Sequence, residues 1–441
     1  MRRSGGFLLL AIFLICLIKW KNARPTSGQR PESHFPVLPM RQRLRIVEQA
    51  APDVRKYLPI PFDEEFDNPC FRNDSRLLCL PAFFVAGGMQ CGVPDMWSRL
   101  TAHAHVGDHH DAAPHWWTNH PRSTAGFFDR YLSLFSNAKT VAQIQAEPRT
   151  LLGDVSPASL AFVMAEQLRL HYQFLDAFDA CYRQCRGHSP PAQLAARCKS
   201  REYHMDHCYG EATSATAPLA FNVPALMATV LHGAAPKVVV LLREPAVRLW
   251  VAFHFYGQYP ARYGKHARGW EFYFGNQSAA WAACADVHGS HACALRFEGH
   301  SHVQADVYYH CDQLIKGMYS EFVPEWQAYV RPQRLLVLRS EDYFERPLRS
   351  VRRVWRLLGL RAPTDAERVA AERPTPRDEA QQVRDEHGEP PAAALAAVRR
   401  FYRPFNARLA EQLDDPAFTW EDRQPPQVET TVGSPPSLRA R

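Results

Sequence analysis

A glycine-bearing segment at residues 87–95, GGMQCGVPD, follows a short apolar run. A buried strand, such a turn and a helix in succession point backbone N–H groups and a helix N-terminus at a phosphate. The segment does not end in Gly-Lys-Ser/Thr, so it is not a Walker motif. A purely structural loop is the alternative interpretation. Taken alone, the segment is therefore a weak indication of an anion site.

Two arginines follow the second apolar run, KVVVLL at residues 237–242. Arg243 comes directly after this run, and Arg248 lies five residues further on. A guanidinium can bind a phosphate through two parallel hydrogen bonds, so this strand end is a second candidate anion site. An ordinary surface role is the alternative. The third apolar run, RLLVLR at residues 334–339, is followed by SEDYF.

These segments must be positioned by strands and helices that the sequence pattern predicts. Strands are expected at 81–86, 237–242 and 334–339. Helices are expected at 95–103, at 348–358 and from Ser156 through Phe174. Strands that alternate with helices predict a mostly parallel sheet flanked by helices on both faces. We therefore expect one α/β domain at 67–420, with a Cys-rich insertion at about 181–215.

The composition is that of a globular protein with a well-filled core. The chain has 441 residues, of which 46% are hydrophobic and 22% are charged. These values exclude bulk disorder and a fibre. The net charge of +7 favours anionic partners without choosing among them. The last segment, at 421–441, is predicted to be disordered.

The N-terminal segment predicts export from the cytoplasm. Residues 7–18 carry no polar side chain except the Cys16 thiol, and basic residues flank the run on both sides. We expect a signal anchor at 1–21, with a cleaved signal peptide as the alternative. Residues 22–66 are predicted to form a stem between the membrane and the folded domain. Because an exported chain does not meet nucleic acid, the basic charge is not assigned to nucleic-acid binding.

The 11 cysteines favour an oxidising compartment. Cys70 with Cys79, and Cys284 with Cys293, are close enough in sequence to close small loops. Four further cysteines gather in the insertion, where two disulfides are preferred over a zinc site with the interleaved histidines, because the spacing is no standard knuckle. These are Cys181, Cys185, Cys198 and Cys208. The sequons at Asn73 and Asn276 predict glycosylation on the lumenal side.

In order and spacing, the three strand-end segments resemble those of the Golgi carbohydrate sulfotransferases, over about residues 68–420 except for the insertion. The most specific matches are PHWW at 114–117, LRSED at 338–342 and FYRPFNARLA at 401–410. The resemblance implies a P-loop-like α/β sulfotransferase fold in a single-pass type II Golgi membrane protein with a lumenal catalytic domain.

The resemblance also implies a reaction and its partners. The sulfate donor would be 3′-phosphoadenosine 5′-phosphosulfate (PAPS), with no metal. The acceptor would be a sugar hydroxyl of a sulfated galactosaminoglycan, chondroitin or dermatan sulfate, with 6-O-sulfation of N-acetylgalactosamine 4-sulfate as the specific reaction. Positioning and charge neutralisation dominate such a transfer, as they do in phosphoryl transfer. A homodimer is left open.

Carried over residue by residue, the family's donor site falls on two segments. Gly88, Gln90, Cys91, Gly92 and Val93 lie in the phosphosulfate loop, and Arg243 and Val251 correspond to the pair that holds the 3′-phosphate. The family loop reads PKCGTTD, whereas residues 89–95 read MQCGVPD. The loop lysine, two threonine hydroxyls and the 3′-phosphate serine are thus replaced.

The catalytic residues implied by the resemblance are Asp154, Gln90 and His115. Asp154 stands where the family has a glutamate, so it is the candidate base, with a helix-cap role as the alternative. Gln90 can donate a hydrogen bond but supplies no charge. Arg99, Arg122, Arg248 and His115 are candidates to compensate for the missing cations. The alternative function is a catalytically impaired relative that binds glycan or a partner enzyme.

Overall fold

A computed structural model describes the folded unit that begins at Leu38. The described residues are 38–107, 114–118, 127–157, 159–161, 180–181, 208, 223–234, 236–295, 313–373 and 378–423. The predicted signal anchor at 1–21 lies outside these ranges, as does most of the helix expected from Ser156 through Phe174. Within the described ranges, no helix is long and apolar enough to cross a membrane.

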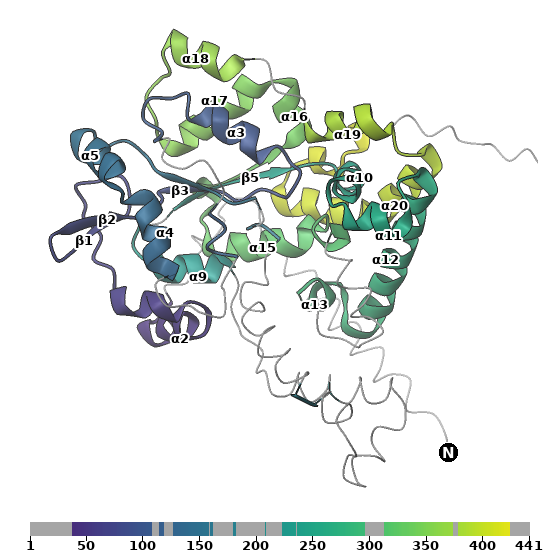
Figure 1. Ribbon diagram of the computed structural model, residues 1–441, viewed down its shortest axis with the longest axis horizontal. Coiled ribbons are helices and arrows are strands. Elements are labelled where there is room, and N and C mark those ends of the chain that lie inside the picture. The colour runs from purple at the N-terminus through teal and green to yellow at the C-terminus, as the bar shows by residue number, and fades with distance from the viewer. Residues whose placement is uncertain are drawn as a thin grey trace, which may run out of the picture. The chain divides into compact units, whose positions relative to one another are not determined.

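A parallel sheet of four strands lies at the centre of the unit (Figure 1). The strands are β3 (Phe83–Val85), β4 (Gly153–Val155), β5 (Lys237–Leu242) and β6 (Leu335–Arg339). Their order is β4-β3-β5-β6, and every neighbouring pair is parallel. The α/β fold with a parallel sheet and flanking helices is thereby confirmed. The three apolar runs recognised in the sequence are β3, β5 and β6.

Helices cover both faces of this sheet, which is why its strands are continuous apolar runs. Phe83 and Leu241 pack in one cluster with residues of α3 and α17, whereas Phe84 and Val240 pack in another with residues of α9 and α15. Figure 1 shows these two pairs of helices on opposite sides of β3 and β5. The four helices are α3 (Val93–Leu100), α17 (Pro347–Leu358), α9 (Val223–Val230) and α15 (Tyr319–Tyr329).

A third apolar cluster lies beyond the sheet and is formed largely by further helices. They are α10 (Pro245–Phe255), α11 (Gln258–Tyr263), α12 (Ala267–His288), α13 (Ser290–Leu295), α19 (Glu379–His387) and α20 (Ala392–Leu413). The segment at 401–410 lies within α20, where Tyr402 is fully buried and donates a hydrogen bond to the carbonyl of Leu314 at 2.7 Å. Its aromatic spacing therefore serves core packing.

The remaining elements are short. They are α2 (Met40–Ala50), η1 (Pro52–Tyr57), β1 (Cys70–Asn73), β2 (Arg76–Cys79), α4 (Phe127–Phe135), α5 (Ala138–Ala146), η2 (Pro332–Arg334), α16 (Ser340–Glu345), α18 (Asp365–Glu372), η3 (Pro416–Thr419) and η4 (Glu421–Arg423). The last of these lies inside the tail that was predicted to be disordered from residue 421. Residues 424–441 lie outside the described ranges.

The structure differs from the stem predicted at 22–66, because residues from Leu38 onward belong to the folded unit. Val47 and Val54 are fully buried in the cluster under the sheet. Arg43 donates a hydrogen bond to the carbonyl of Thr229 in α9 at 3.0 Å. The local sequence does not reveal this packing, because the partner helix α9 lies far away along the chain.

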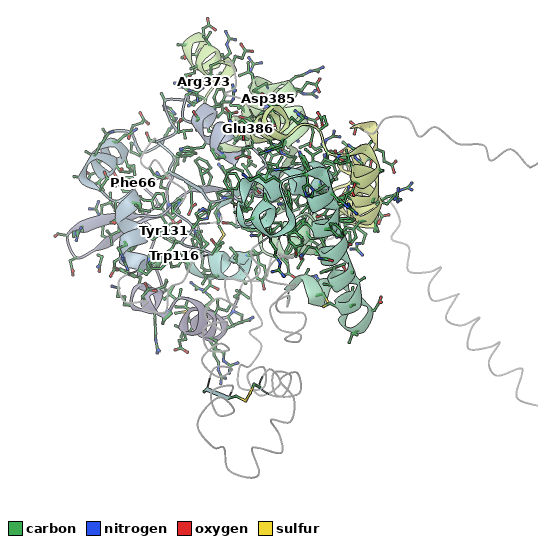
Figure 2. All side chains as sticks on the ribbon, turned by 45° about the vertical axis from the view of Figure 1, so that its right-hand side comes forward. Phe66, Trp116, Tyr131, Arg373, Asp385 and Glu386 are labelled. Atoms are coloured by element: carbon green, nitrogen blue, oxygen red, sulfur yellow. A yellow bond between two sulfur atoms is a disulfide. The ribbon has the colours of Figure 1, made fainter. Side chains whose placement is uncertain are left out.

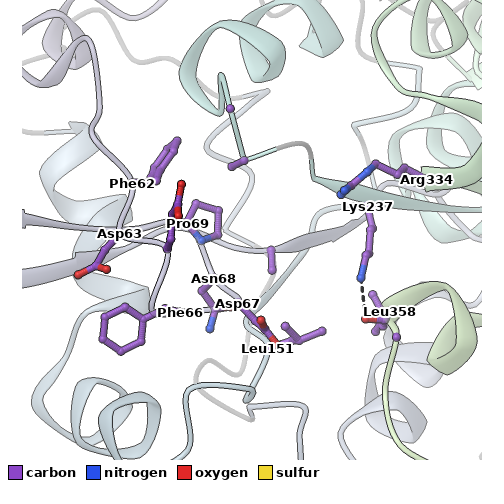
Figure 3. Close-up of a pocket in the computed structure, with 15 residues that line it drawn as sticks. Phe62, Asp63, Phe66, Asp67, Asn68, Pro69, Leu151, Lys237, Arg334 and Leu358 are labelled. Atoms are coloured by element: carbon purple, nitrogen blue, oxygen red, sulfur yellow. Dashed lines mark hydrogen bonds between the residues drawn. The ribbon is translucent and has the colours of Figure 1, made fainter.

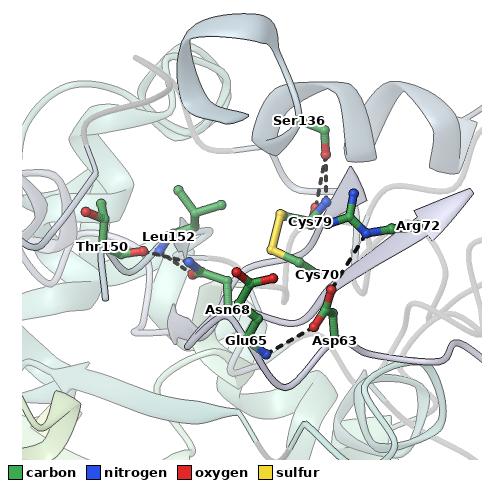
Figure 4. The surroundings of a disulfide bond; sticks show 9 residues. All are labelled: Asp63, Glu65, Asn68, Cys70, Arg72, Cys79, Ser136, Thr150 and Leu152. Carbon is green, nitrogen blue, oxygen red and sulfur yellow. Dashed lines mark hydrogen bonds and ion pairs between the residues drawn. A yellow bond between two sulfur atoms is a disulfide. The ribbon is translucent and has the colours of Figure 1, made fainter. Parts of the chain in front are cut away.

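The predicted disulfide between Cys70 and Cys79 closes a two-stranded hairpin (Figure 4). The two cysteines are directly opposite in the antiparallel β1–β2 ladder, and the backbone N–H of Cys79 donates to the hydroxyl of Ser136 at 2.8 Å. The predicted disulfide between Cys284 and Cys293 is also present. In the insertion Cys181 is bonded to Cys208, while Cys185 and Cys198 lie outside the described residues.

The ion pairs between His291 of α13 and two glutamates of α15 predict a pH-dependent stability. His291 lies 3.3 Å from Glu321 and 3.4 Å from Glu325, and these carboxylates raise the pKa of His291 to about 9 from an ordinary value of 6.5. Protonated His291 stabilises the fold through these ion pairs. This stabilisation is complete below pH 6.5 and is lost as the pH rises through about 9. Because the imidazole is half exposed, the effect is small.

We expect His291→Gln to lower the melting temperature by about 1–2 °C at pH 6, and to change it little at pH 10. Thermal denaturation of the variant and the wild-type chain at both pH values measures this difference. A melting difference that is equal at pH 6 and pH 10 would contradict the assignment.

Candidate functional site

The glycine-bearing loop leaves β3 and enters α3 along the carboxyl edge of the sheet. Its first part runs beside β5, because the N–H of Gly88 donates to the carbonyl of Leu241 at 3.0 Å. Gln90 and Gly92 then adopt left-handed backbone conformations, with φ of 58° and 87°. Such a loop before a helix N-terminus can gather N–H groups around an anion. Pro94 lies in the first turn of α3, where proline costs no hydrogen bond.

Arg243 lies against this loop, directly after β5. Its Nε donates to the carbonyl of Gln90 at 2.6 Å. Its two terminal nitrogens donate to the two carboxylate oxygens of Asp378 at 2.7 Å and 2.5 Å. The Arg243 side chain is 5% exposed, so this is a buried bidentate ion pair. The structure thus brings the loop and the predicted phosphate arginine into one site, and it adds Asp378, which no sequence pattern indicated.

The segment after β6 contacts the same loop. The hydroxyl of Ser340 donates to the carbonyl of Cys91 at 2.7 Å. A Cβ at Gly92 would lie 2.7 Å from Cε2 of Phe344, and the guanidinium carbon of Arg243 lies 5.5 Å from the centre of the same ring. All three strand ends therefore meet at one place, and Gly92 is required both by its positive φ and by the Phe344 ring.

Gln90 stands where the family loop has lysine, and its side-chain amide is incompletely satisfied. The residue is 5% exposed. Its Nε2 lies 3.5 Å from the hydroxyl of Tyr256, while Oε1 has no hydrogen-bond partner in the described part of the chain. A buried acceptor without a donor costs free energy. Gln90 Oε1 is therefore suited to a ligand that donates a hydrogen bond, and the uncharged Gln90 side chain cannot offset negative charge.

Cys91 carries no nucleophilic chemistry. Its thiol is buried and lies 4.0 Å from the hydroxyl of Tyr319, which itself donates to the carbonyl of Arg243 at 2.8 Å. Burial raises the pKa of Cys91 to about 11, against the opposing charges of Arg243 and Arg248. A thiol must ionise to attack, so Cys91 serves packing of the loop.

Asp154 lies on β4, beside β3, and is fully buried. Its two carboxylate oxygens accept hydrogen bonds from the hydroxyls of Tyr131 and Ser156, each at 2.6 Å. The indole N–H of Trp117 in turn donates to the Tyr131 hydroxyl at 2.9 Å. Figure 2 shows Trp116 next to Tyr131, with which it stacks at 5.1 Å between ring centres. As a base, Asp154 would have to give up one of its two hydrogen bonds.

His115 lies beside this carboxylate cluster. Its backbone N–H donates to the Ser156 hydroxyl at 3.0 Å, and its φ is 51°. Burial lowers the pKa of His115 from its ordinary value of 6.5, Asp154 opposes this shift, and Lys316 adds to it. The imidazole is therefore neutral at pH 7 and can accept a proton. Lys316 is a cation of this region that the sequence pattern did not reveal.

Several residues considered from the sequence are buried in packing or bound to other groups of the protein. Val251 is fully buried in the cluster around α10, so its assignment to the 3′-phosphate site is corrected: it packs against protein. Val93 is 1% exposed and packs in the cluster that α3 and α17 form on the sheet. Arg99 is bound to Asp95 at 2.8 Å, and buried Arg248 donates to the side chain of Gln313 at 3.2 Å, so neither replaces the missing lysine. Arg122 lies outside the described residues.

A separate cavity of about 450 Å³ opens at the other end of the strands (Figure 3). Lys237, at the start of β5, donates to the carbonyl of Leu358 at 2.6 Å, and Arg334 precedes β6. Burial and Arg334 lower the pKa of Lys237. Because this cavity lies at the amino edge of the sheet and the glycine loop at the carboxyl edge, it takes no part in the chemistry considered above.

The sequon asparagines Asn73 and Asn276 are exposed, which leaves their glycosylation a prediction. In the described ranges, no group of three or more His, Cys, Asp or Glu side chains is arranged to hold a metal ion.

The buried ion pair of Arg243 and Asp378 predicts a large energetic coupling. Asp378→Ala would leave a buried guanidinium without its anion and should lower the free energy of unfolding by about 3 kcal/mol. The double variant with Arg243→Ala should lose less than the sum of the two single variants. Urea denaturation measures all three, with exposed Asp385→Ala on the same helix as a control that stays within about 0.5 kcal/mol of wild type. Additive effects would show that the pair contributes nothing as a pair.

Comparisons with known proteins support the sequence resemblance. No protein-family model matches the chain. Carbohydrate sulfotransferase 15 from Homo sapiens is 24% identical over 365 residues, which cover 78% of this chain and 55% of that protein. The Mus musculus and Rattus norvegicus proteins of the same name are also 24% identical. The chain thus spans about half the length of the curated relatives it matches.

Among solved structures, a sulfotransferase from Alicyclobacillus acidocaldarius is similar at 14% identity and a TM-score of 0.37, over 76% of this chain and 96% of that one. A likeness this loose adds no argument about the fold or the site. The sequence match to three curated sulfotransferases, on a parallel α/β fold whose loop and arginine meet at one edge, makes this chain a relative of the carbohydrate sulfotransferases.

Proposed function

We propose that this chain transfers a sulfuryl group from PAPS to a sugar hydroxyl of a sulfated galactosaminoglycan. One observation carries the proposal: beside the glycine loop, Arg243 already holds a two-oxygen anion, the Asp378 carboxylate, in a bidentate pair. This carboxylate stands in for a phosphate, which a guanidinium binds with the same fork geometry. The residues therefore fit the 3′-phosphate of the donor once Asp378 withdraws.

The loop would hold the other end of the donor, whose bound form supplies an activated sulfuryl group. The backbone N–H groups around Gly92, at the start of α3, would bind its negatively charged oxygens. The Gln90 Nε2, which lies 3.5 Å from the Tyr256 hydroxyl, would donate a hydrogen bond where the family has a charged lysine, whereas Gln90 Oε1 can only accept. Glycine at 88 allows the loop to pack on itself, because a Cβ there would lie only 2.9 Å from the Cys91 sulfur.

His115 is the base that this arrangement favours for the acceptor hydroxyl. It is neutral because burial lowers its pKa, and the nearby Asp154 charge would stabilise the imidazolium that forms when it takes the proton. Asp154 itself is fully buried and accepts two hydrogen bonds. We therefore assign proton transfer to His115 and its positioning to the Asp154 cluster.

The sequence relationship also motivates a narrower proposal. We infer that the acceptor is N-acetylgalactosamine 4-sulfate in chondroitin or dermatan sulfate, sulfated at O6. We further infer a type II glycoprotein of the Golgi lumen held by a signal anchor, with a homodimer left open. Three disulfides within the described ranges suit an oxidising lumen.

A second candidate function rests on the charge of the site. Asp378 neutralises Arg243, and the loop at 87–95 contains no lysine. Each charge-assisted contact to a transition state that is missing costs about 3 kcal/mol, or about a hundredfold in rate. These features favour a catalytically impaired protein that binds glycan or a partner sulfotransferase.

Donor binding is tested by calorimetry of the full chain with adenosine 3′,5′-bisphosphate. We expect Arg243→Ala to weaken binding at least about a hundredfold, because it removes a bidentate contact to a phosphate. Asp378→Asn should strengthen binding about tenfold, since the competing carboxylate is gone. Exposed Arg400→Ala serves as the matched control and should bind as wild type. Wild-type binding by Arg243→Ala would refute the assigned site.

Transfer itself is measured with sulfate-labelled PAPS and chondroitin sulfate as acceptor. We expect the rate to rise with pH through a midpoint below 6.5, because the lowered pKa keeps His115 unprotonated above it. His115→Gln should lower kcat about a hundredfold and abolish this midpoint, whereas exposed His232→Gln should change neither. Nucleotide binding without any transfer would favour the second candidate function.

A further inference from the structure

The helix α17 has one face in the core and one face made of arginines. Val351, Val354 and Leu358 are buried against the sheet, and Trp355 joins them. The opposite face is exposed and carries Arg349, Arg352, Arg353 and Arg356, with Arg346 directly before the helix. A single amphipathic helix therefore both covers the sheet and presents four positive charges to solvent, with a fifth directly before it.

Four of these arginines, all except Arg353, line a hollow, which we call the arginine groove. It has a volume of about 690 Å³ and is lined by Glu345, Arg346, Pro347, Leu348, Arg349, Arg352, Arg356 and Glu372. The arginines follow each other at steps of three or four residues, so they lie on adjacent turns of one face. From Arg346 to Arg356 the row extends about 15 Å along the axis. Its length suits an extended polyanion better than a single phosphate.

The positive charge of the groove is poorly compensated within the chain. Arg346 pairs with Glu345 at 3.5 Å. In the described part of the chain, Arg349, Arg352, Arg353 and Arg356 make no ion pair, although Arg356 donates to the carbonyl of Arg352 at 3.3 Å. Like charges three and four residues apart destabilise a helix. A bound polyanion would remove that repulsion.

The groove begins beside the candidate donor site. Phe344, whose ring covers Gly92, is two residues before Arg346. The helix then runs along the sheet toward its amino edge, since the Leu358 carbonyl near its end accepts from Lys237 at the start of β5. A chain that lies in the groove would thus have one end near the loop and the rest held away from it.

We propose that the arginine groove binds a sulfated glycan chain and so holds the acceptor polymer next to the site of transfer. A guanidinium pairs with two sulfate oxygens at once, and several such pairs in a row select a chain with repeated sulfates. The inference rests on the proposed function for its purpose, but the arginines of the binding surface belong to α17 and the residue before it, and none of them takes part in the donor site. The inference can therefore be tested separately from donor binding.

The test uses the full chain and immobilised chondroitin sulfate, with desulfated chondroitin as the comparison. The triple variant Arg349→Gln, Arg352→Gln, Arg356→Gln removes the row while keeping good helix formers. We expect it to lose at least about tenfold in affinity for chondroitin sulfate and to depend less on salt. The charge-matched control replaces the exposed Arg41, Arg45 and Arg76 with Gln and should bind as wild type.

A second variant guards against a folding defect. The triple variant Arg349→Lys, Arg352→Lys, Arg356→Lys keeps the charge but not the bidentate hydrogen bonding, so its affinity should fall between those of wild type and the glutamine variant. Adenosine 3′,5′-bisphosphate should bind all variants equally, which separates this inference from the proposed donor site. Unchanged glycan binding by the glutamine variant, an equal loss in the charge-matched control, or equal affinity for desulfated chondroitin would each overturn the proposal.

Discussion

The structure of the site depends on one constraint, the burial of the Arg243 guanidinium. A buried cation requires an anion at close range, because desolvation of an unpaired charge costs several kcal/mol. Here Asp378 provides it, while the carbonyl of Gln90 accepts the Nε–H and the ring centre of Phe344 lies 5.5 Å from the guanidinium carbon. The loop and all three strand ends therefore organise around a charge pair, and any phosphate that enters must replace a carboxylate.

This exchange links the site to the helix α19. Asp378 directly precedes α19, and at the last residue of that helix His387 stacks on His254 of α10 at 4.1 Å between ring centres. Displacement of Asp378 by a nucleotide would therefore act on the start of a helix whose other end is held by ring packing. The affinity of the site for its donor is set by this competition as much as by the contacts that the donor itself would make.

The central part of the fold could be predicted from the sequence, but the contacts that set the charge of the site could not. The strands β3, β5 and β6 were predictable because a strand buried on both faces is a continuous apolar run. Asp378 and Lys316 reach the site through long-range packing, and no local pattern marks such residues. Val251 was misassigned because correspondence along the chain does not fix which face of α10 points inward. The packing of α2 was missed for a related reason: its burial depends on α9, far away in sequence.

The departures of the loop from the family pattern make physical sense as contributions to packing. Val93 joins the cluster that α3 and α17 form on the sheet, and Pro94 occupies a first helical turn where no N–H is needed. Both changes keep the strand, loop and helix in place while they remove hydroxyl donors, and Gln90 removes a charge. Fold and chemistry can thus separate within a few residues: the backbone that would cradle an anion is retained, and in the part of the chain that the structure describes Arg243 is the cation bound to the loop. Whether that single guanidinium holds a nucleotide or a carboxylate decides between an enzyme and a binding protein, and one side chain, Asp378, controls the balance.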